Sequence, residues 1–257
     1  HDDPIQAALE QAGFSGAVLS PPIGGVVSPV HRAVENHCCL AAIPGAAPVF
    51  VKRRHEDMAA FIHPEDAIEA SGKAGEIGIA PRLLHADAAR GILIFEALGE
   101  EWSWGHVDVL RRPPVLENLL AAKRRFHGVT PLAQTRSVFD LIQTYRRLAD
   151  APDVPLPSPV ATVSAAVEDI AAAIAASGVD TVACHADGAS SNVMVGPSNT
   201  VRLVDFEWAR QADPAYDLGT VLAELLPFDG EALLAIEMAT GKPDAQVHEA
   251  MLQSLTA

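Results

Sequence analysis

The chain has 257 residues, of which 49% are hydrophobic and 20% are charged. This length and composition are typical of a globular protein with a sizeable core and argue against a disordered chain. The net charge of -15, from 33 acidic and 18 basic residues, provides no basic surface for nucleic acid or an anionic membrane. It suits a cationic small molecule, although acidity for solubility alone is common.

The first hundred residues combine strand-like segments with turn chemistry. Residues 43–45, Ile-Pro-Gly, indicate a turn between two strands, which predicts a hairpin. A proline is tolerated in a first helical turn, so Pro64 fits the start of a helix. In chain order we expect a short helix at 5–9, strands at 26–27, 30–34 and 48–51, a helix at 64–76 and a buried strand at 91–97.

The rest of the chain is mainly helical. Leucines and aromatic residues recur there at helical spacing. The expected elements are helices at 116–126 and 139–148, a proline-rich connector at 152–159, a helix at 163–176, strands at 182–184, 193–195 and 201–204, and helices from about 216 onward. Strands with one helix followed by mostly helices predict an α+β protein of two lobes, joined near 96–100 with a cleft between them.

The three cysteines show neither a disulfide framework nor the C-x-x-C spacing of a metal site. We expect reduced and mostly buried thiols. The alanine-rich segment 170–176 is too short to span a bilayer, and two acidic residues precede it. The first residues carry neither a basic region nor an apolar signal core. These features predict a cytoplasmic protein with no membrane partner.

The segment 185–217 has the clearest chemical pattern. His185, Asp187 and Asn192 lie in a polar loop between two expected strands, and Asp205 follows a third. A hairpin would bring the loop and Asp205 to the same end. Phosphoryl transfer needs such convergence, because a carboxylate orients the attacking hydroxyl while oxygen ligands hold Mg2+ against the phosphates. Carboxylate and carboxamide oxygens are hard ligands, which suit magnesium better than zinc.

The loop reads H-x-D-x-x-x-x-N, and the third strand continues as D-F-E-W-A-x-x-x-D-P-x-x-D-L. These motifs resemble the choline/ethanolamine kinase family and, more broadly, the aminoglycoside phosphotransferase superfamily. The resemblance implies a bilobal, protein-kinase-like α+β fold. Residues 1–98 would form a nucleotide-binding lobe with a small antiparallel sheet and a helix, and 99–257 a larger, mainly helical lobe with the catalytic loop and acceptor site. ATP with Mg2+ would be the donor and a small alcohol the acceptor.

The resemblance also implies roles for single residues. Asp187 would be the catalytic base, braced by His185, while Asn192 and Asp205 would bind magnesium. Asp217 would anchor the loop from the following helix. Taken singly, an aspartate or asparagine in a loop is more often a helix cap or turn residue, and a lone histidine is more often a core residue. The ordered set is what favours a kinase, because general-base chemistry requires positioned groups.

The N-terminal half contains weaker matches to a phosphate-binding region. Gly24, Gly25 and Ser28 resemble the glycine loop that covers nucleotide phosphates, since glycine lets backbone N–H groups approach phosphate oxygens. Pro29 departs from the family pattern, where a small polar residue is usual, and an ordinary turn is the alternative interpretation. By resemblance, Glu96 and Leu98 belong to the hinge that holds adenine through backbone groups.

Lys52, at the end of the apolar run 48–51, resembles the strand lysine that binds ATP phosphates, a role suited to a point charge on a flexible stem. A solvated strand end is the alternative, because two arginines follow. Alternation along the strand places Lys52 on one face with Phe50. The expected partner is a helix glutamate. Glu69 fits the spacing better than Glu65, but the sequence does not decide between them.

Aromatic faces and carboxylates bind quaternary ammonium groups. Glu207 and Trp208 follow the metal-binding motif directly, and the resemblance places Glu207 at the border of the acceptor site. Packing inside the lobe is an equally good interpretation of Trp208. Aromatic residues total only 5%, so a full aromatic cage is not evident.

Three hypotheses remain open. The chain is a kinase for choline, ethanolamine or a related amino alcohol, or a kinase of the same fold for an aminoglycoside or sugar-like alcohol. The third hypothesis is an inactive pseudokinase that binds nucleotide and serves as an interaction module. The joint presence of a lysine, a base and two magnesium ligands argues against the third.

Overall fold

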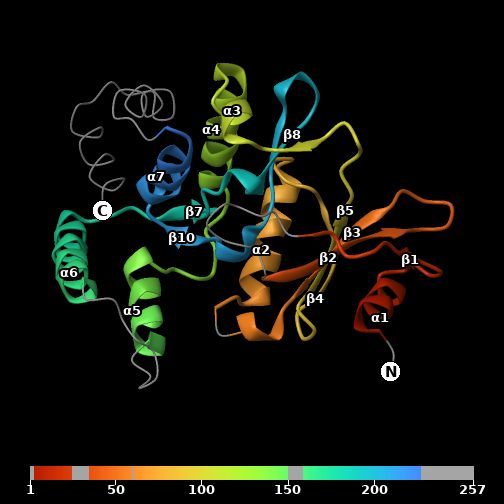
Figure 1. Cartoon of the computed structure of the whole chain (residues 1–257), viewed down its shortest axis with the longest axis horizontal. Helices are drawn as coiled ribbons and strands as arrows, with labels where there is room; N and C mark the ends of the chain where they lie inside the picture. Colours follow the sequence, from red (N-terminus) through yellow and green to blue (C-terminus); the bar gives the residue numbers. More distant parts are fainter. Residues whose placement is uncertain (1–2, 25–34, 60, 150–158, 227–257) are drawn as a thin grey trace.

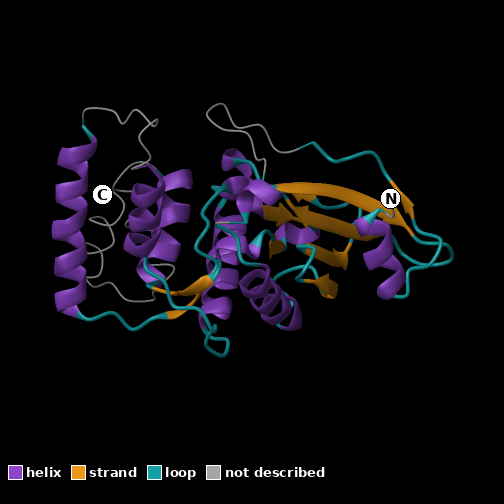
Figure 2. Cartoon of the chain, turned by 90° about the horizontal axis from the view of Figure 1, so that it is seen from below, coloured by secondary structure: helices purple, strands orange, loops and turns teal. Residues whose placement is uncertain are grey.

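The computed structural model describes residues 3–24, 35–59, 61–149 and 159–226. Within them, an antiparallel sheet with two helices lies beside a mainly helical region (Figures 1 and 2). The α+β class expected from the sequence is confirmed. The strands expected at 26–27 and 30–34, most of the connector at 152–159 and the helices beyond 226 lie outside the described residues.

The N-terminal sheet has five strands, and every neighbouring pair is antiparallel. Its strands, in spatial order, are β1 (Val18–Leu19), β2 (Asn36–Ala42), β3 (Val49–Arg54), β5 (Ile92–Glu96) and β4 (Leu83–Asp87). The accompanying helices are α1 (Pro4–Gln11) and α2 (Pro64–Glu76). Asp3 caps α1 by accepting a hydrogen bond from the Ile5 N–H at 3.0 Å. The bounds of α2 match the prediction.

Strand alternation gives the sheet two different faces. On β3, Val49 and Val51 are buried in a core with Leu9 of α1, whereas Phe50 and Lys52 line a cavity on the opposite face. The predicted alternation is therefore confirmed, because successive side chains of a strand point to opposite faces. One face of the sheet builds the core, and the other builds one wall of a cleft.

Three strands of this sheet, β1, β2 and β4, were not predicted. The strand β2 has the sequence NHCCLAA, whose polar and small residues give little strand signal, but it pairs with β3 along its length. The strand β4 was also missed, and it pairs with β5 across an irregular register. The predicted turn at 43–45 does join two strands, which are β2 and β3.

The second region packs helices against short strands. Its elements are β6 (Ser103–Trp104), α3 (Val107–Leu110), α4 (Pro113–His127), α5 (Val138–Ala149), α6 (Val160–Ser177), β7 (Val182–Cys184), β8 (Val193–Val195), β9 (Val201–Leu203), β10 (Arg210–Ala212) and α7 (Pro214–Leu225). The apolar stripe of α4, including Leu119 and Phe126, is buried in the largest core cluster with Leu222 of α7. The division between residues 98 and 99 stays a prediction.

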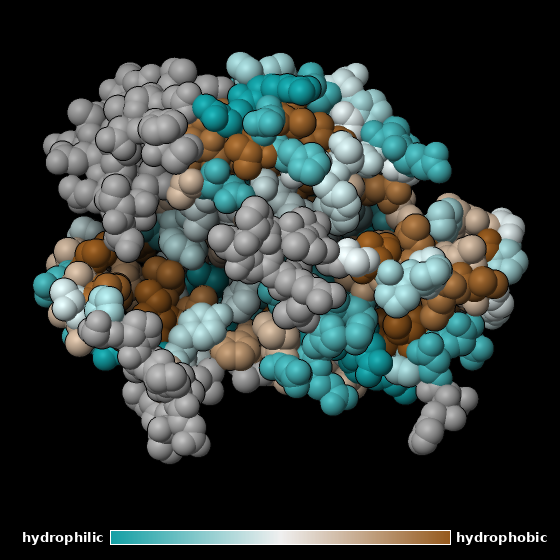
Figure 3. All heavy atoms as spheres, viewed as in Figure 1, coloured by the Kyte–Doolittle hydropathy of each residue, from teal (hydrophilic) through white to brown (hydrophobic). Residues whose placement is uncertain are grey.

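Helix α6 is the described helix that is long and apolar enough, by length and composition, to cross a membrane. None of its residues is buried, and hydrophobic side chains are visible on this part of the face drawn in Figure 3. Glu168, however, lies near its middle and accepts a hydrogen bond from Arg146 of α5 at 2.8 Å. A carboxylate at that depth would oppose insertion by about 2.5–3.5 kcal/mol. The ion pair instead links α6 to α5.

Candidate active site

The polar loop with the predicted catalytic residues runs from β7 to β8. Its last turn is a 3-10 helix, η2 (Ser190–Asn192). Strands β8 and β9 pair antiparallel with Val193 opposite Leu203, and the Val204 N–H donates to the Asn192 carbonyl at 3.0 Å. As predicted, the hairpin brings Asn192 and Asp205 to the same end.

A cavity of about 380 Å³ separates the N-terminal sheet from this hairpin. Such a volume is within the range of small-molecule sites. The predicted site residues that line it are Gly24, Lys52, Glu96, Leu98, Asn192, Asp205 and Glu207. Asp187 and Trp208 are not among its lining residues. The two other predicted positions of the glycine loop, Gly25 and Ser28, lie outside the described residues.

Lys52 is the central cation of the cavity. It is only 7% exposed, and its Nζ lies 2.6 Å from Oδ1 of Asp205 and 3.0 Å from Oε1 of Glu207. Burial by itself would lower the pKa of Lys52, but the two carboxylates outweigh burial and raise this pKa. The lysine is therefore charged and fixed beside the predicted metal ligand, and the interpretation of Lys52 as a solvated strand end is wrong.

The expected pairing of Lys52 with a glutamate of α2 is not present. Glu69 instead binds the Nζ of Lys73, one turn further along the same helix, at 2.8 Å, and it accepts the Ala133 N–H at 2.9 Å. Glu65 is exposed. The rotation of α2 about its axis explains why this ion pair is absent, since the helix turns its small residues toward the cavity and Glu69 away from Lys52.

The predicted hinge borders the cavity at the end of β5. Glu96 directs its carboxylate to the Nη1 of Arg202 at 2.5 Å, and the Arg202 guanidinium lies 5.3 Å from the ring centre of Trp102. This leaves the hinge backbone, rather than the Glu96 side chain, to contact an adenine. Leu98 lines the cavity beside it. Adenine binding by these residues stays a prediction.

His185 connects the backbone of the loop to the segment that carries Asp205. Its Nε2 lies 2.9 Å from the Val204 carbonyl oxygen and its Nδ1 lies 2.9 Å from that of Asp187. The His185 ring also packs edge-on against Phe206, with 4.6 Å between ring centres. Burial, and then the nearby Lys123 ammonium, lower the pKa of His185. The bracing role implied by the resemblance agrees with this geometry.

Asp187 has one carboxylate oxygen bound to its own loop. Its Oδ1 accepts the Ala189 N–H at 2.9 Å, and its backbone carbonyl accepts a hydrogen bond from the Lys123 Nζ at 3.1 Å. Asp187 is partly exposed, and its backbone carbonyl is held by Lys123 of α4.

Asp217 anchors the loop, as expected. Its Oδ1 accepts from the Ala186 N–H at 2.7 Å and from the Lys123 Nζ at 2.8 Å, and its Oδ2 lies 2.8 Å from Nε2 of His127. Burial opposes ionisation, but Lys123 and His127 outweigh it and lower the pKa of Asp217. Sequence reasoning missed Lys123, which is 1% exposed.

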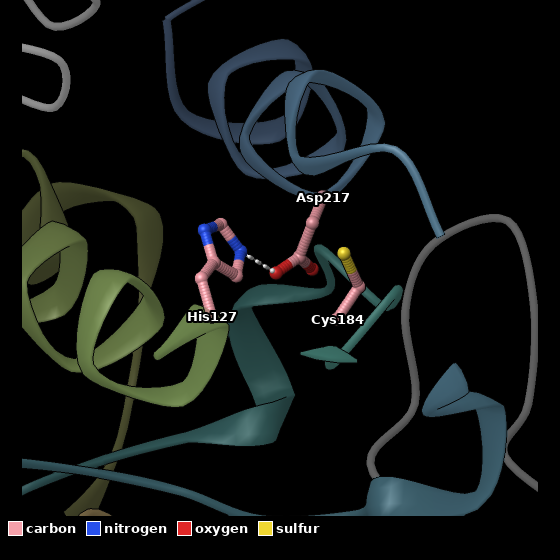
Figure 4. Close-up of side chains that lie close together, drawn as sticks. All are labelled: His127, Cys184 and Asp217. Atoms are coloured by element: carbon pink, nitrogen blue, oxygen red, sulfur yellow. Dashed lines mark hydrogen bonds and ion pairs between the residues drawn. The ribbon is translucent and has the colours of Figure 1, made fainter. Parts of the chain in front are cut away.

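Figure 4 shows His127, Cys184 and Asp217 grouped near the end of α4. Among the described residues these three place possible metal-ligand atoms within 4.8 Å of one another. The site is already neutralised, however, because the Lys123 ammonium lies against Asp217. Burial raises the pKa of Cys184, whose thiol lies 3.4 Å from the Ala212 carbonyl oxygen, so a thiolate ligand is disfavoured. The cluster is a structural anchor for the loop.

The two residues predicted for the acceptor site lie in different surroundings. Glu207 is 8% exposed, and its Oε2 accepts from the Nδ2 of Asn36 at 3.0 Å. Trp208 lines a separate hollow of about 30 Å³ together with Phe61 and Arg210. A third tryptophan, Trp104 of β6, lines the large cavity and is 41% exposed.

The cavity edge offers ligands of the kind that magnesium prefers. Asn192 and Asp205 contribute carboxamide and carboxylate oxygens, and the Asn192 side chain makes no hydrogen bond within the described residues. The backbone of Asp205 is left-handed, with φ of 65°, as is that of Ala186, with φ of 60°. Strained positions of this kind concentrate at functional sites. The donor set therefore fits Mg2+.

The sequence profile of a family described as "Phosphotransferase enzyme family" matches residues 31–251. A search of curated protein sequences gives no significant match. Many solved structures share the fold. One is a choline/ethanolamine kinase family protein from Mesorhizobium loti, which is 20% identical with a TM-score of 0.72, over 98% of this chain and 81% of the other.

The choline kinase LicA from Streptococcus pneumoniae is 18% identical with a TM-score of 0.76, over 96% of this chain and 86% of that one. A spectinomycin phosphotransferase solved with ADP and spectinomycin is 12% identical with a TM-score of 0.59, over 98% of this chain and 85% of that one. These structures confirm the kinase-like fold. At such identities they do not identify the substrate.

Proposed function

Because the chain belongs to the phosphotransferase enzyme family, we propose that it transfers the γ-phosphate of ATP to the hydroxyl group of a small amino alcohol such as choline or ethanolamine. The observation that carries this proposal is the convergence of Lys52, Asn192 and Asp205 on one cavity bordered by the hinge. A phosphotransferase needs a cation for the phosphates, oxygen ligands for a metal and a place for adenine within one cleft.

The residues of the chain divide the work. Asp187 accepts the proton of the acceptor hydroxyl as its oxygen attacks phosphorus, and the bond from phosphorus to the leaving ADP oxygen breaks. Lys52 stabilises the charge on the leaving diphosphate. Asn192 and Asp205 would hold Mg2+, which neutralises phosphate charge when bound. His185, Lys123 and Asp217 fix the loop that carries the base.

Two observations favour an amino alcohol as acceptor. The two choline and ethanolamine kinase structures have higher TM-scores, 0.72 and 0.76, than the spectinomycin phosphotransferase at 0.59. Trp104 also presents an aromatic surface at the cavity, and aromatic faces attract quaternary ammonium groups. An aminoglycoside acceptor is the second candidate, favoured by the low aromatic content of 5%, because carboxylates alone can bind its amines.

The test is release of ADP from ATP, with and without magnesium, against choline, ethanolamine, aminoglycosides and simple sugars. We expect release that depends on an amino alcohol. Asp187→Ala should lower turnover by about two to four orders of magnitude while sparing ATP affinity. Asp180→Ala is the matched control, because Asp180 is exposed and lies before β7, outside the loop motif that begins at His185.

Asp205→Ala should weaken ATP binding as well as turnover, because it removes a metal ligand beside Lys52. Near-normal turnover of Asp187→Ala would refute the assigned base. Magnesium-dependent ATP binding without turnover on any acceptor would instead favour the pseudokinase hypothesis.

A further inference from the structure

The face of α2 that borders the cavity carries no carboxylate. Ala67 and Ser71 line the cavity from this helix, and each is 2% exposed. The glutamates of α2 are directed elsewhere, since Glu69 binds Lys73 and Glu65 is exposed. A kinase-like site normally requires a helix carboxylate to hold the strand lysine. In this chain α2 offers Lys52 no charged partner.

Both carboxylates that hold Lys52 come instead from one short segment, 205–207. The left-handed backbone of Asp205 opens a 3-10 turn, η4 (Phe206–Trp208), so that residues 205 and 207 approach the same ammonium group. The Nζ lies 2.6 Å from Asp205 and 3.0 Å from Glu207. Asp205 is also a predicted metal ligand, and a metal would compete with the ammonium for its carboxylate. Glu207 is not among the predicted metal ligands.

The surroundings of Glu207 are those of a fixed group. Its two oxygens bind two neighbouring strands, since Oε1 lies 3.0 Å from Lys52 of β3 and Oε2 accepts at 3.0 Å from Asn36, the first residue of β2. The side chain is 8% exposed. A carboxylate with both oxygens occupied by the sheet is poorly placed to bind an acceptor amine.

We propose that Glu207 is the positioning residue for Lys52, taking the place of a carboxylate on α2. This inference rests on the proposed function of the cavity as an ATP site. Glu207 keeps the lysine ammonium at the phosphates when Asp205 turns to the metal. The segment 205–207 then sets the position of the Lys52 ammonium, and a movement of α2 would not change it.

The test measures ATP affinity and acceptor KM separately. Glu207→Gln preserves the shape of the side chain and removes its charge. We expect the Kd of magnesium-ATP to rise by about ten-fold, since the ion pair with Lys52 becomes a weaker hydrogen bond to a neutral amide oxygen, with the KM of the acceptor unchanged. Glu69→Gln is the matched control on α2 and should leave the ATP Kd within about two-fold.

A rescue experiment separates positioning from simple damage. Ala67→Glu places a carboxylate on the face of α2 that lines the same cavity as Lys52. The double variant Ala67→Glu/Glu207→Gln should recover ATP affinity to within about three-fold of the natural chain. If Glu207→Gln alone does not fold, the same double variant decides the question. A double variant that folds but binds ATP about ten-fold more weakly would overturn the proposal.

The opposite effect of Glu207→Gln on the ATP Kd and the acceptor KM would also overturn the proposal. An unchanged ATP Kd together with a raised acceptor KM in Glu207→Gln would assign Glu207 to the acceptor. Titration of ATP needs no acceptor, so the test stands even if the acceptor is misidentified. Failure of the natural chain to bind magnesium-ATP would refute the proposed function itself.

Discussion

Replacing Lys123 with methionine is expected to lower the free energy of unfolding by about 3–5 kcal/mol, because it leaves a buried charge without its partner. The Lys123 side chain is 1% exposed and that of Asp217 is 0% exposed, with 2.8 Å between Nζ and Oδ1. Methionine keeps a similar volume but donates no hydrogen bond. The loss would be a large share of the roughly 5–15 kcal/mol typical of a folded domain.

The hydrogen bonds that remain in Lys123→Met offset the loss of stability only in part. Asp217 keeps the Ala186 N–H and the ring of His127, whereas the carbonyl of Asp187 loses the Lys123 hydrogen bond. Turnover should therefore fall together with stability, because the carbonyl of the base keeps its contact with His185 but loses the one with Lys123. Urea denaturation followed by circular dichroism gives the free energy and, through an unchanged m-value, a check on two-state behaviour.

The double variant Lys123→Met/Asp217→Asn is the control. It removes both charges. The decrease in its free energy of unfolding should therefore be smaller, by at least about 1 kcal/mol, than the sum of the decreases in the two single variants. A loss below about 1 kcal/mol for Lys123→Met alone would refute the reasoning. It would mean that, without Lys123, the Asp217 carboxylate is either hydrated or protonated in the folded chain.

Gly188→Ala should cost at least about 1–3 kcal/mol in chemical denaturation, because its Cβ would lie 2.3 Å from the Thr220 backbone carbon; Gly72→Ala, which meets nothing within 4 Å, should not destabilise. Burial raises the pKa of Cys38 to about 11, so iodoacetamide at pH 8 should label it far more slowly than unfolded chain, as read by mass spectrometry. The pKa of His185 is lowered by burial and Lys123, so the unfolded chain binds its proton more readily, and stability is complete above about pH 6.5 and falls below it. His185→Gln should flatten that fall between pH 7.5 and 5.5, and an unchanged pH profile would contradict the lowered pKa.

The sequence alone predicted the features that depend on neighbouring residues. The helix Pro64–Glu76 was found with its bounds, because proline at a first turn and helical spacing are local signals. The strands before and after the loop were also found, and with them the convergence of Asn192 and Asp205. Asp217 was expected as the anchor and is one. These results follow from short-range chemistry and from an ordered motif.

Features that depend on the rotation of an element against its neighbours came only from the tertiary structure. Lys123 lies in the run Lys-Arg-Arg, which in sequence is typical of a solvated helix end. Helix geometry nevertheless buries Lys123 beside Leu119 and Phe126, while the two arginines that follow are exposed. Its position four residues after Leu119 was the one signal that could have revealed it.

The partner of Lys52 was decided in the same way. Spacing along α2 allowed Glu65 or Glu69, and neither was correct, because packing turned the small residues of that helix toward the cavity. Glu207, distant in sequence, filled the position through a turn that the left-handed Asp205 creates. Sequence spacing fixes which residues share a face of a helix, but only packing against the rest of the chain decides where that face points.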